Sequence, residues 1–304
     1  MNPEELLENF QEHLKVLGRA PGAIYGTSHR LSYFFKWLKR EDIGLSELSP
    51  AVIRKFTGYL QIEYVTKKGT PFSVASIQGI LSCLRCFLRY LARAGYLLCD
   101  LSREVMAPRG KSALPRDILS YREVKSLLAG PELDEPLGLR NRSILELFYS
   151  SGVRRRELIN LDLYDVDLDK MNLCVRQGKG GKDRMLPLGR WAAYYLKEYL
   201  EKSRPLLFDA PSEKALFLGR SGQRLTPGRV GMIVRECARG LAPGKHLTCH
   251  ALRHTFATHL LEAGAEIRAI QELLGHVELR STQIYTRISP QELKKVHKKC
   301  HPRG

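Results

Sequence analysis

The chain has 304 residues, which is enough for two domains of roughly 150 residues each. Its 49 Lys and Arg against 32 Asp and Glu give a net charge of +17. A surplus of this size indicates a polyanionic partner, either nucleic acid or an anionic membrane, although positive charge can also serve solubility alone.

Nothing in the sequence marks export or membrane insertion. Met1 to Phe10 carry three Glu and no basic residue, which is the reverse of a signal peptide. No run approaches the roughly 18 apolar residues of a spanning helix. The seven cysteines are scattered and odd in number, as is typical of free thiols in a reducing compartment. We therefore expect a cytoplasmic protein without a membrane anchor.

Residues 1–101 are expected to form a helical domain. Apolar residues recur at helical spacing from Ile24 to Leu38 and from Ile77 to Leu91. Ser49-Pro50 is typical of a helix start, and Ser73 or Ser76 is expected to start the next helix. Residues 102–116 then read as a linker, because prolines and a glycine break any periodic pattern there.

Residues 117–304 are expected to form a mixed second domain. Ser120 with Glu123 fits a capping box. A long helix is expected over Leu139–Tyr149, with an interruption at 150–152 and a short helix from Arg155. Further helices are expected after Thr226-Pro227 and from Thr248, with breaks at Gly264 and Gly275.

A β-hairpin is expected in the middle of this domain. Leu173 and Val175 on one side, and Leu186 and Leu188 on the other, alternate around the sequence GKGGKD at 178–183. Lys179 and Lys182 would then stand on a glycine-rich tip, where they can reach a groove or an active site. A plain solvated hairpin fits the same residues. The tip is not a P-loop, because the GxxxxGK[ST] pattern is absent.

The segment HALRHTFATH, residues 250–259, is expected to be a helix with two distinct faces. His250, Arg253 and His254 share one face, and Leu252 and Phe256 share the opposite one. A His and an Arg one turn apart can bind a phosphate from two points. A solvated polar face is the alternative interpretation.

Two features raise the possibility of zinc. His250 and His254 stand four residues apart, and Cys83 to Cys86 form a CxxC. The histidine pair lacks the Glu of HExxH, since Ala251 stands there, and the CxxC has no second pair at finger spacing. Core cysteines are the preferred interpretation of the CxxC.

In SGVRRREL, residues 151–158, Gly152 is expected to turn the chain just before a helix. Arg154 then sits where backbone N–H groups and its own side chain can converge on an anion. Three successive arginines cannot all point one way, so at most one or two are expected to meet the same phosphate. A surface basic patch is the alternative.

Near the end of the chain, Ser281 is expected to cap a helix that carries Tyr285 one turn inside. A tyrosine hydroxyl is a poor nucleophile at its free pKa of about 10, and it would need cationic neighbours or a base. Taken alone, Tyr285 fits a surface or core aromatic better than a nucleophile.

The order of these motifs resembles the tyrosine recombinase (phage integrase) family, in particular its Xer-type (XerC/XerD) members, and the ending HPRG belongs to the likeness. The resemblance covers nearly the whole chain. It is carried by Arg154 in SGVRRREL, Lys179 in GKGGKDRMLPL, His250 and Arg253 in HALRHTFATH, His276 in LLGH and Tyr285 in STQIYT.

The resemblance implies a fold that is mainly α with a small antiparallel β-sheet in the second domain. It also implies a two-domain clamp on DNA. Residues 1–101 would be the helical core-binding (SAM-like) domain, with no arm-binding domain expected before it. Residues 102–116 would be the linker, and 117–304 the catalytic domain.

The resemblance also implies catalytic roles. Arg154 and Arg253 would hold the scissile phosphate and offset its charge in the transition state. His250 would hydrogen-bond that phosphate and help to move the proton of the nucleophile. The remaining three roles would be general acid for Lys179, transition-state hydrogen bonding for His276 and nucleophilic attack for Tyr285.

Such an enzyme forms a 3′-phosphotyrosyl intermediate and keeps the phosphoester energy, so no cofactor, metal or ATP is expected. The implied partners are double-stranded DNA with an inverted-repeat recombination site, and a homo- or hetero-tetramer on two duplexes. The implied role is chromosome dimer resolution or the integration and excision of a mobile element. Alternatives are a catalytically silent, sequence-specific DNA-binding regulator and a type IB topoisomerase-like DNA-relaxing enzyme.

The chain departs from the family pattern at two positions. Arg156 stands where a small residue is usual, and Cys249 stands where Pro is common before the motif histidine. The basic tail at 294–299 is expected either to dock on a neighbouring protomer, as family tails do, or to be a solvated helix end.

Overall fold

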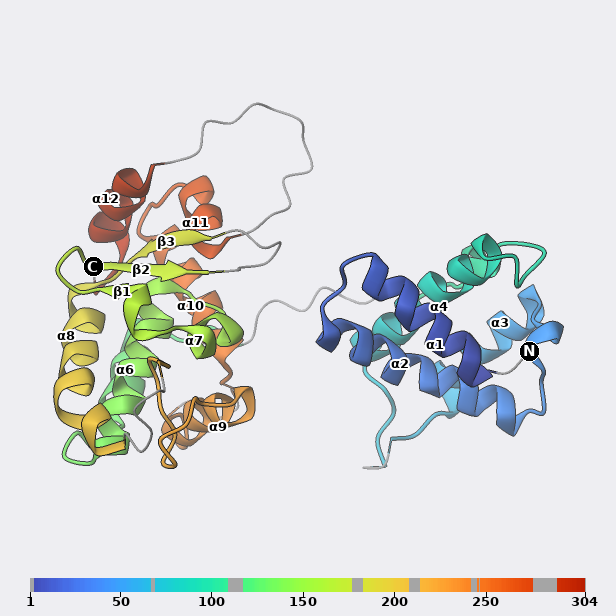
Figure 1. Ribbon diagram of the computed structural model, residues 1–304, viewed down its shortest axis with the longest axis horizontal. Coiled ribbons are helices and arrows are strands. Elements are labelled where there is room, and N and C mark those ends of the chain that lie inside the picture. The colour runs from blue at the N-terminus through green and yellow to red at the C-terminus, as the bar shows by residue number, and fades with distance from the viewer. Residues whose placement is uncertain are drawn as a thin grey trace. The chain divides into compact units, whose positions relative to one another are not determined.

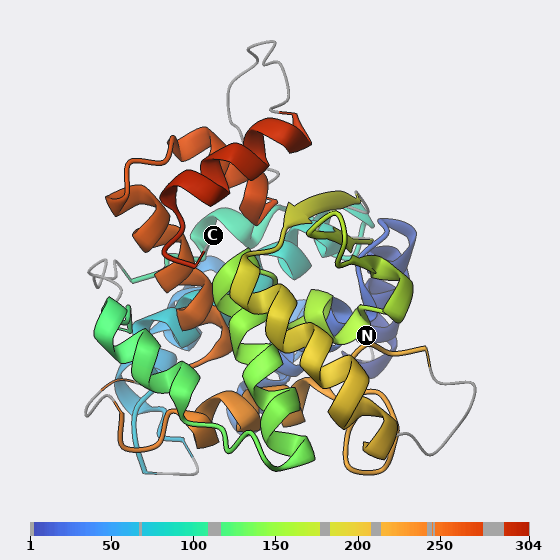
Figure 2. The ribbon, with the colours of Figure 1, turned by 90° about the vertical axis from the view of Figure 1, so that its left-hand side faces the viewer.

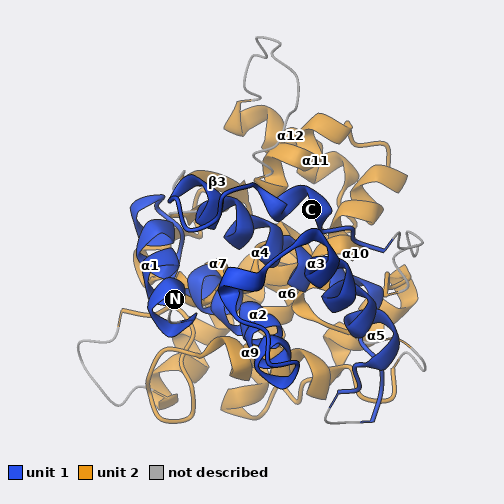
Figure 3. Ribbon diagram, turned by 90° about the vertical axis from the view of Figure 1, so that its right-hand side faces the viewer, with its two compact units in different colours: residues 1–113 blue, residues 114–304 orange. Residues whose placement is uncertain are grey.

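The computed structural model describes residues 3–66, 69–108, 117–176, 183–207, 214–241, 245, 247–275 and 289–303. The chain divides into two compact units, residues 1–113 and 114–304 (Figure 3). Each unit has a hydrophobic core of its own and is described by itself.

The first unit is built from helices that pack around one core (Figure 1). Single turns of 3-10 or π-helix join or follow the longer α-helices. Its described elements are α1 (Pro3–Val16), α2 (Pro21–Arg40), η1 (Leu45–Glu47), α3 (Pro50–Gly58), η2 (Tyr59–Glu63), α4 (Val74–Arg93) and η3 (Leu101–Glu104).

The predicted helix starts in this unit are confirmed. The Ser49 hydroxyl accepts the backbone N–H of Val52 at 3.4 Å, and Pro50 follows it as the first helical residue. Of the two candidates for the next helix, Ser73 is the cap, because its hydroxyl accepts the N–H of Ser76 at 3.2 Å.

Helix α4 places its apolar stripe, from Ile77 to Leu91, inside the core of the first unit, as its spacing predicts. Trp37 of α2 joins the same core, which the sequence pattern did not indicate. Within the described part of the chain, α4 is the one helix long and apolar enough to cross a membrane on length and composition alone. Its apolar stripe already has a protein core to cover it.

The second unit combines helices with a small sheet (Figure 1). Its described elements, in chain order, are α5 (Tyr121–Ala129), α6 (Pro136–Ser151), α7 (Arg155–Asn160), η4 (Leu163–Asp165), β1 (Val166–Asp167), β2 (Asn172–Val175), β3 (Arg184–Pro187), α8 (Arg190–Glu198), η5 (Tyr199–Ser203), η6 (Arg204–Leu207), α9 (Pro227–Cys237), α10 (Cys249–Glu262), α11 (Ile267–Leu274) and α12 (Pro290–Cys300).

The sheet is antiparallel with the order β1-β2-β3, and Leu173 lies opposite Leu186 across β2 and β3. Because side chains alternate along a strand, Leu173 and Val175 both reach the core. The predicted pair of strands is therefore confirmed, while β1 was not predicted. Residues 177–182, which include Lys179 and Lys182 of the tip, lie outside the described residues. The predicted fold class, mainly α with a small antiparallel sheet, is confirmed.

Helix α6 runs through the core of the second unit, packed against α8 and α10 (Figure 2). It begins at Pro136 and continues to Ser151, so the predicted interruption at 150–152 is wrong for its first two residues. The Ser151 hydroxyl donates to the carbonyl of Leu147 at 2.6 Å and stays within the helix. Gly152, with a φ of +60°, ends it.

Helix α12 packs on the second unit of its own chain. Ring nitrogens of His297 and His301 lie 2.7 Å and 2.9 Å from the carbonyl oxygens of Ser150 and Tyr149, at the end of α6. Both rings are buried. The lysines of the tail alternate with these buried positions on the outer side of the helix. Helix α12 is thus docked in its own unit, with Lys295, Lys298 and Lys299 exposed. Docking of the tail on a neighbouring protomer stays a prediction.

The end of α6 generates the first testable prediction. A Cβ at Gly152 would lie 2.5 Å from the Phe256 ring, whereas one at Gly264, also at positive φ, would meet nothing within 4 Å. We expect Gly152→Ala to lower the free energy of unfolding by about 2–5 kcal/mol, from backbone strain and overpacking together. The matched control Gly264→Ala carries the backbone strain alone, about 1–2 kcal/mol. Urea unfolding of both variants measures the difference, and equal losses would contradict the close packing of Gly152.

Candidate active site

Three of the six predicted site residues are described by the structure, and all three meet at one pocket of about 450 Å³. Arg154 stands at the N-terminus of α7, while His250 and Arg253 belong to α10, about a hundred residues later in the chain. Lys179, His276 and Tyr285 lie outside the described residues. The fold thus brings together all three predicted site residues that lie in the described part of the chain.

Arg154 is placed by the way α6 ends. Gly152 turns the chain out of the helix, and Arg154 then caps α7. Its backbone N–H donates to Oε2 of Glu157 at 2.7 Å, and its guanidinium donates to Oε1 of the same residue at 2.7 Å. A single carboxylate therefore fixes both the main chain and the side chain of Arg154.

Arg253 is placed by a firmly anchored helix. The Thr248 hydroxyl caps α10 by accepting the N–H of Ala251 at 3.1 Å, and Leu252 and Phe256 are fully buried on its core face. The solvated polar face considered for this helix is wrong for Arg253, whose exposed fraction is 4%. Instead, its guanidinium donates to the carbonyl oxygens of Gly152 and Leu274.

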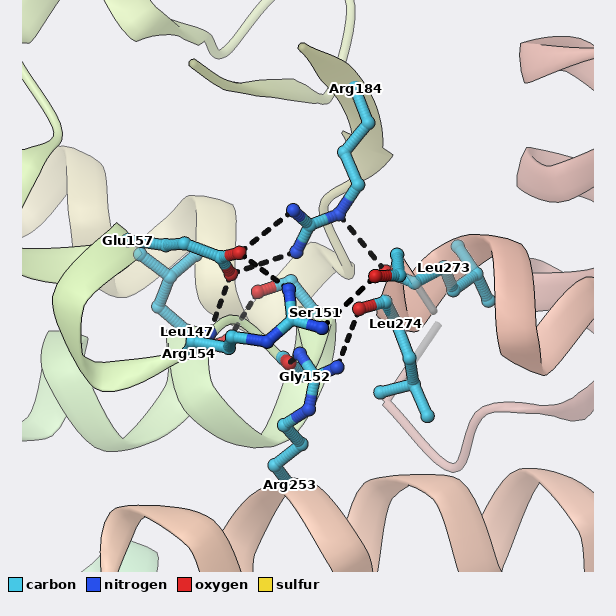
Figure 4. A network of polar contacts seen from close by, with 10 residues as sticks. Leu147, Ser151, Gly152, Arg154, Glu157, Arg184, Arg253, Leu273 and Leu274 are labelled. Atoms are coloured by element: carbon cyan, nitrogen blue, oxygen red, sulfur yellow. Dashed lines mark hydrogen bonds and ion pairs between the residues drawn. The ribbon is translucent and has the colours of Figure 1, made fainter. Parts of the chain in front are cut away.

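The C-terminal end of α11 is the point where these contacts converge. Three successive carbonyl oxygens there each accept from a different arginine (Figure 4). A helix C-terminus leaves its last carbonyls without helical partners and carries partial negative charge, so cations are stabilised there. The three contacts are Arg184 Nε to Leu273 at 3.4 Å, Arg253 to Leu274, and Arg154 to Gly275 at 3.0 Å.

Glu157 is the acid that balances this cluster. It is buried, and Arg184 donates to its two oxygens at 2.9 Å and 2.8 Å, in addition to the bonds from Arg154. Burial by itself would raise the pKa of Glu157. Hydrogen bonds from Arg184 and from the Arg154 N–H outweigh burial and lower the pKa to about 2, so the carboxylate is ionised at neutral pH.

Glu157 and Arg184 were not among the predicted site residues. Glu157 could have been found, because a Glu three residues after a helix cap is a capping-box position. Arg184 carries no comparable local signal, since its partners lie 27 and 89 residues away in the sequence.

His250 lies at the exposed side of the pocket, with its ring centroid 4.6 Å from that of His254. Partial burial lowers its pKa below the usual value, and the neighbouring His254, Arg253 and Arg154 lower it further. The lowered pKa favours the neutral imidazole at pH 7, which is able to accept a proton or a hydrogen bond.

Metal binding finds no support in the described part of the chain, where no group of three His, Cys, Asp or Glu side chains could hold an ion. The CxxC lies in α4, where Cys83 is half-buried and Cys86 is exposed. The core interpretation is therefore wrong for Cys86, whose thiol points away from the buried stripe of α4.

The walls of the pocket are strongly basic. Arg155 and Arg156 border it beside Arg154, and Arg235 of α9 faces it from another helix. Its lining residues include no carboxylate. The basic patch considered for this segment is therefore present, and the surface is suited to a polyanion.

Comparison with known proteins identifies the family. A profile of the phage integrase family matches residues 117–292, and a profile of the phage integrase SAM-like domain matches residues 5–104. The chain belongs to the phage integrase family. It is 37% identical over 297 residues to tyrosine recombinase XerC 2 of Ralstonia nicotianae, covering 97% of this chain and 85% of that protein.

A second relative spans nearly its full length. Tyrosine recombinase XerD of Lacticaseibacillus casei is 41% identical over 302 residues, which cover 98% of this chain and 99% of that protein. Among solved structures, a lambda integrase dimer bound to a COC′ core site has the same fold as this chain, with a TM-score of 0.68. The two sequences are 21% identical, and the match covers 95% of this chain and 100% of that chain.

The lowered pKa of Glu157 leads to a prediction about stability. Its folded-state pKa of about 2 lies below the ordinary value of 4.5, so its contribution is complete above pH 4.5 and is lost as the pH falls through 2. We expect Glu157→Gln to lower the free energy of unfolding by about 3 kcal/mol at pH 6. The difference in the free energy of unfolding between the variant and the wild type should become smaller as the pH falls from 4.5 towards 2. Urea unfolding at several pH values measures this difference.

The control is Glu236→Gln, which removes an exposed carboxylate 3.5 Å from Arg229. This variant should stay within about 0.5 kcal/mol of the wild type across the same pH range. A Glu157→Gln gap that does not change with pH would contradict the role of Glu157 as an ionised partner of the arginines.

Proposed function

We propose that this member of the phage integrase family is a site-specific tyrosine recombinase that cuts and rejoins DNA strands with Tyr285 as the nucleophile. The observation that carries the proposal is the meeting of Arg154, Arg253 and His250 at one basic pocket. Two guanidinium groups beside a neutral imidazole suit a phosphodiester that gains negative charge in the transition state while the attacking hydroxyl loses its proton.

The two arginines would bind the non-bridging oxygens of the scissile phosphate. Each guanidinium has five N–H donors. Among the described residues, Arg154 uses its two terminal nitrogens towards Glu157 and Gly275, and Arg253 uses its own towards Gly152 and Leu274. Each guanidinium therefore keeps N–H donors for a substrate phosphate. Each is also held in place by hydrogen bonds to the protein itself.

Proton transfer would complete the reaction. His250, neutral at pH 7, would take part in removing the hydroxyl proton of Tyr285. Tyr285 would attack phosphorus to give a 3′-phosphotyrosyl link, while Lys179 would protonate the departing 5′-oxygen and His276 would hydrogen-bond the phosphate. The 5′-hydroxyl of a partner strand would then reverse the step, so that one phosphoester replaces another and no ATP is consumed.

The substrate would be double-stranded DNA with an inverted-repeat site, bound by residues 1–101 as the core-binding domain and by 117–304 as the catalytic domain, with 102–116 as the linker. Four protomers on two duplexes would exchange strands pairwise. Relatives named XerC and XerD favour chromosome dimer resolution over the movement of a genetic element. An enzyme acting on a chromosomal substrate would work in the cytoplasm.

Covalent capture tests the chemistry. A suicide substrate nicked beside the scissile phosphate should trap the wild-type protein as a DNA adduct that survives denaturing electrophoresis, because the released short strand cannot return. Tyr285→Phe should give no adduct and still bind the DNA. No adduct with the wild type would favour a silent DNA-binding regulator, and an adduct without joint products between two sites would favour a topoisomerase-like activity.

A salt titration tests the basic pocket. Contacts to several phosphates should make the affinity for DNA fall by about 10³–10⁵ between 50 and 200 mM salt if about 6–10 phosphates are neutralised. Arg155→Gln, at the pocket wall, should make the negative slope of log affinity against log salt shallower by about one. Lys202→Gln, which removes an ammonium paired with Glu198, is the control and should leave the slope unchanged. Affinity that does not respond to salt would contradict phosphate binding.

A further inference from the structure

Arg184 connects the sheet of the second unit to both of the arginines proposed to bind the phosphate. It is the first residue of β3, and its side chain reaches from the strand to the space between α7 and the end of α11 (Figure 4). The side chain is only 13% exposed. It does not line the pocket itself, so any effect on the reaction must pass through its neighbours.

The first of these neighbours is Glu157. Arg184 donates to Oε1 at 2.9 Å and to Oε2 at 2.8 Å, while Arg154 donates to Oε1 with its guanidinium and to Oε2 with its backbone N–H, both at 2.7 Å. Each carboxylate oxygen is thereby held from two sides. With four hydrogen bonds the carboxylate has a fixed plane, and this plane fixes the direction of the Arg154 side chain.

The second neighbour is the end of α11. Arg184 Nε lies 3.4 Å from the carbonyl of Leu273, and a Cβ placed on Gly275 would lie 3.1 Å from the Arg184 side chain. The next two carbonyls, of Leu274 and Gly275, receive Arg253 and Arg154. Arg184 thus holds the same helix end against which the other two arginines are set.

We propose that Arg184 is a positioning residue for strand cleavage: through Glu157 and the C-terminal end of α11 it sets the directions of Arg154 and Arg253 towards the phosphate. The inference rests on the proposed recombinase activity and deepens it.

The charges of the cluster support the same role. Arg154, Arg184 and Arg253 bring three positive charges to one carboxylate, which leaves a surplus for a phosphate. Without Arg184, Glu157 would be bonded in the described structure by Arg154 alone, and its negative charge would act against the positive charge offered to the substrate. Arg184 therefore holds the carboxylate in place and shares its charge.

The test compares Arg184→Met with Arg142→Met. Arg142 is a matched control, because it is 10% exposed, pairs with buried Glu146 at 2.9 Å and donates to the carbonyl of Leu128, yet it does not line the pocket. In each variant the glutamate keeps a second arginine, Arg154 or Arg303. Loss of stability should therefore be similar in the two, as thermal unfolding checks.

Cleavage should separate the two variants. With saturating protein on the suicide substrate, we expect Arg184→Met to cleave about 10–100-fold more slowly than the wild type, since small misplacement of binding groups costs rates of this order. Arg142→Met should stay within about twofold. The dissociation constant for DNA should change little in either. Arg184→Lys, which cannot span both oxygens of Glu157, should recover part of the rate.

A substrate with sulfur as the 5′-bridging atom separates a defect in protonating the leaving group from a defect in holding the phosphate. A thiolate leaves without a proton, so this substrate should restore cleavage by Lys179→Ala, the variant of the proposed general acid. It should not restore Arg184→Met, whose defect lies in the charges that hold the phosphate.

The inference would be overturned by wild-type cleavage with Arg184→Met, by an equal loss with Arg142→Met, or by rescue of Arg184→Met with the sulfur substrate. These outcomes all require a wild type that forms the adduct. An inactive wild type would instead count against the proposed function, so the two failures are distinguishable.

Discussion

The second unit depends on the negative end of one short helix. Three carbonyl oxygens at the end of α11 and one buried carboxylate hold three arginines that come from a turn after α6, from a strand and from α10. Burying guanidinium groups is costly unless each finds partners. These partners are backbone oxygens at the ends of α6 and α11 and the carboxylate of Glu157 in α7. Because they come from three different elements, pairing the charges also holds these elements of the unit together.

Local signals predicted much of the fold. Ser49, Ser73, Ser120 and Thr226 each begin the helix that their capping chemistry indicates. The end of α6 was misjudged because two serines resemble a break, whereas tertiary burial and the bond from Ser151 to Leu147 keep them helical. Strand β1 was missed because two residues are too few to show a period.

The candidate site was predictable only in part. Arg154, His250 and Arg253 carry recognisable motifs, and the resemblance to a family ordered them. No pattern in the sequence could show that Arg253 is buried, because its helix face also holds the exposed His250 and His254. Arg184 was beyond reach for a different reason: its role follows from contacts across 27 and 89 residues of sequence, which only the folded chain creates.

The burial of Arg253 has an evolutionary consequence. In a descendant that had lost DNA cleavage, selection for a stable fold alone would still retain this buried arginine, which donates to the carbonyl oxygens of Gly152 and Leu274. Its presence in a sequence is therefore only weak evidence of activity. His250 is exposed at the edge of the pocket, and the stability of the fold does not depend on it in this way. In related sequences, a substitution at this histidine would therefore be an earlier sign of lost cleavage activity than a substitution at the buried arginine.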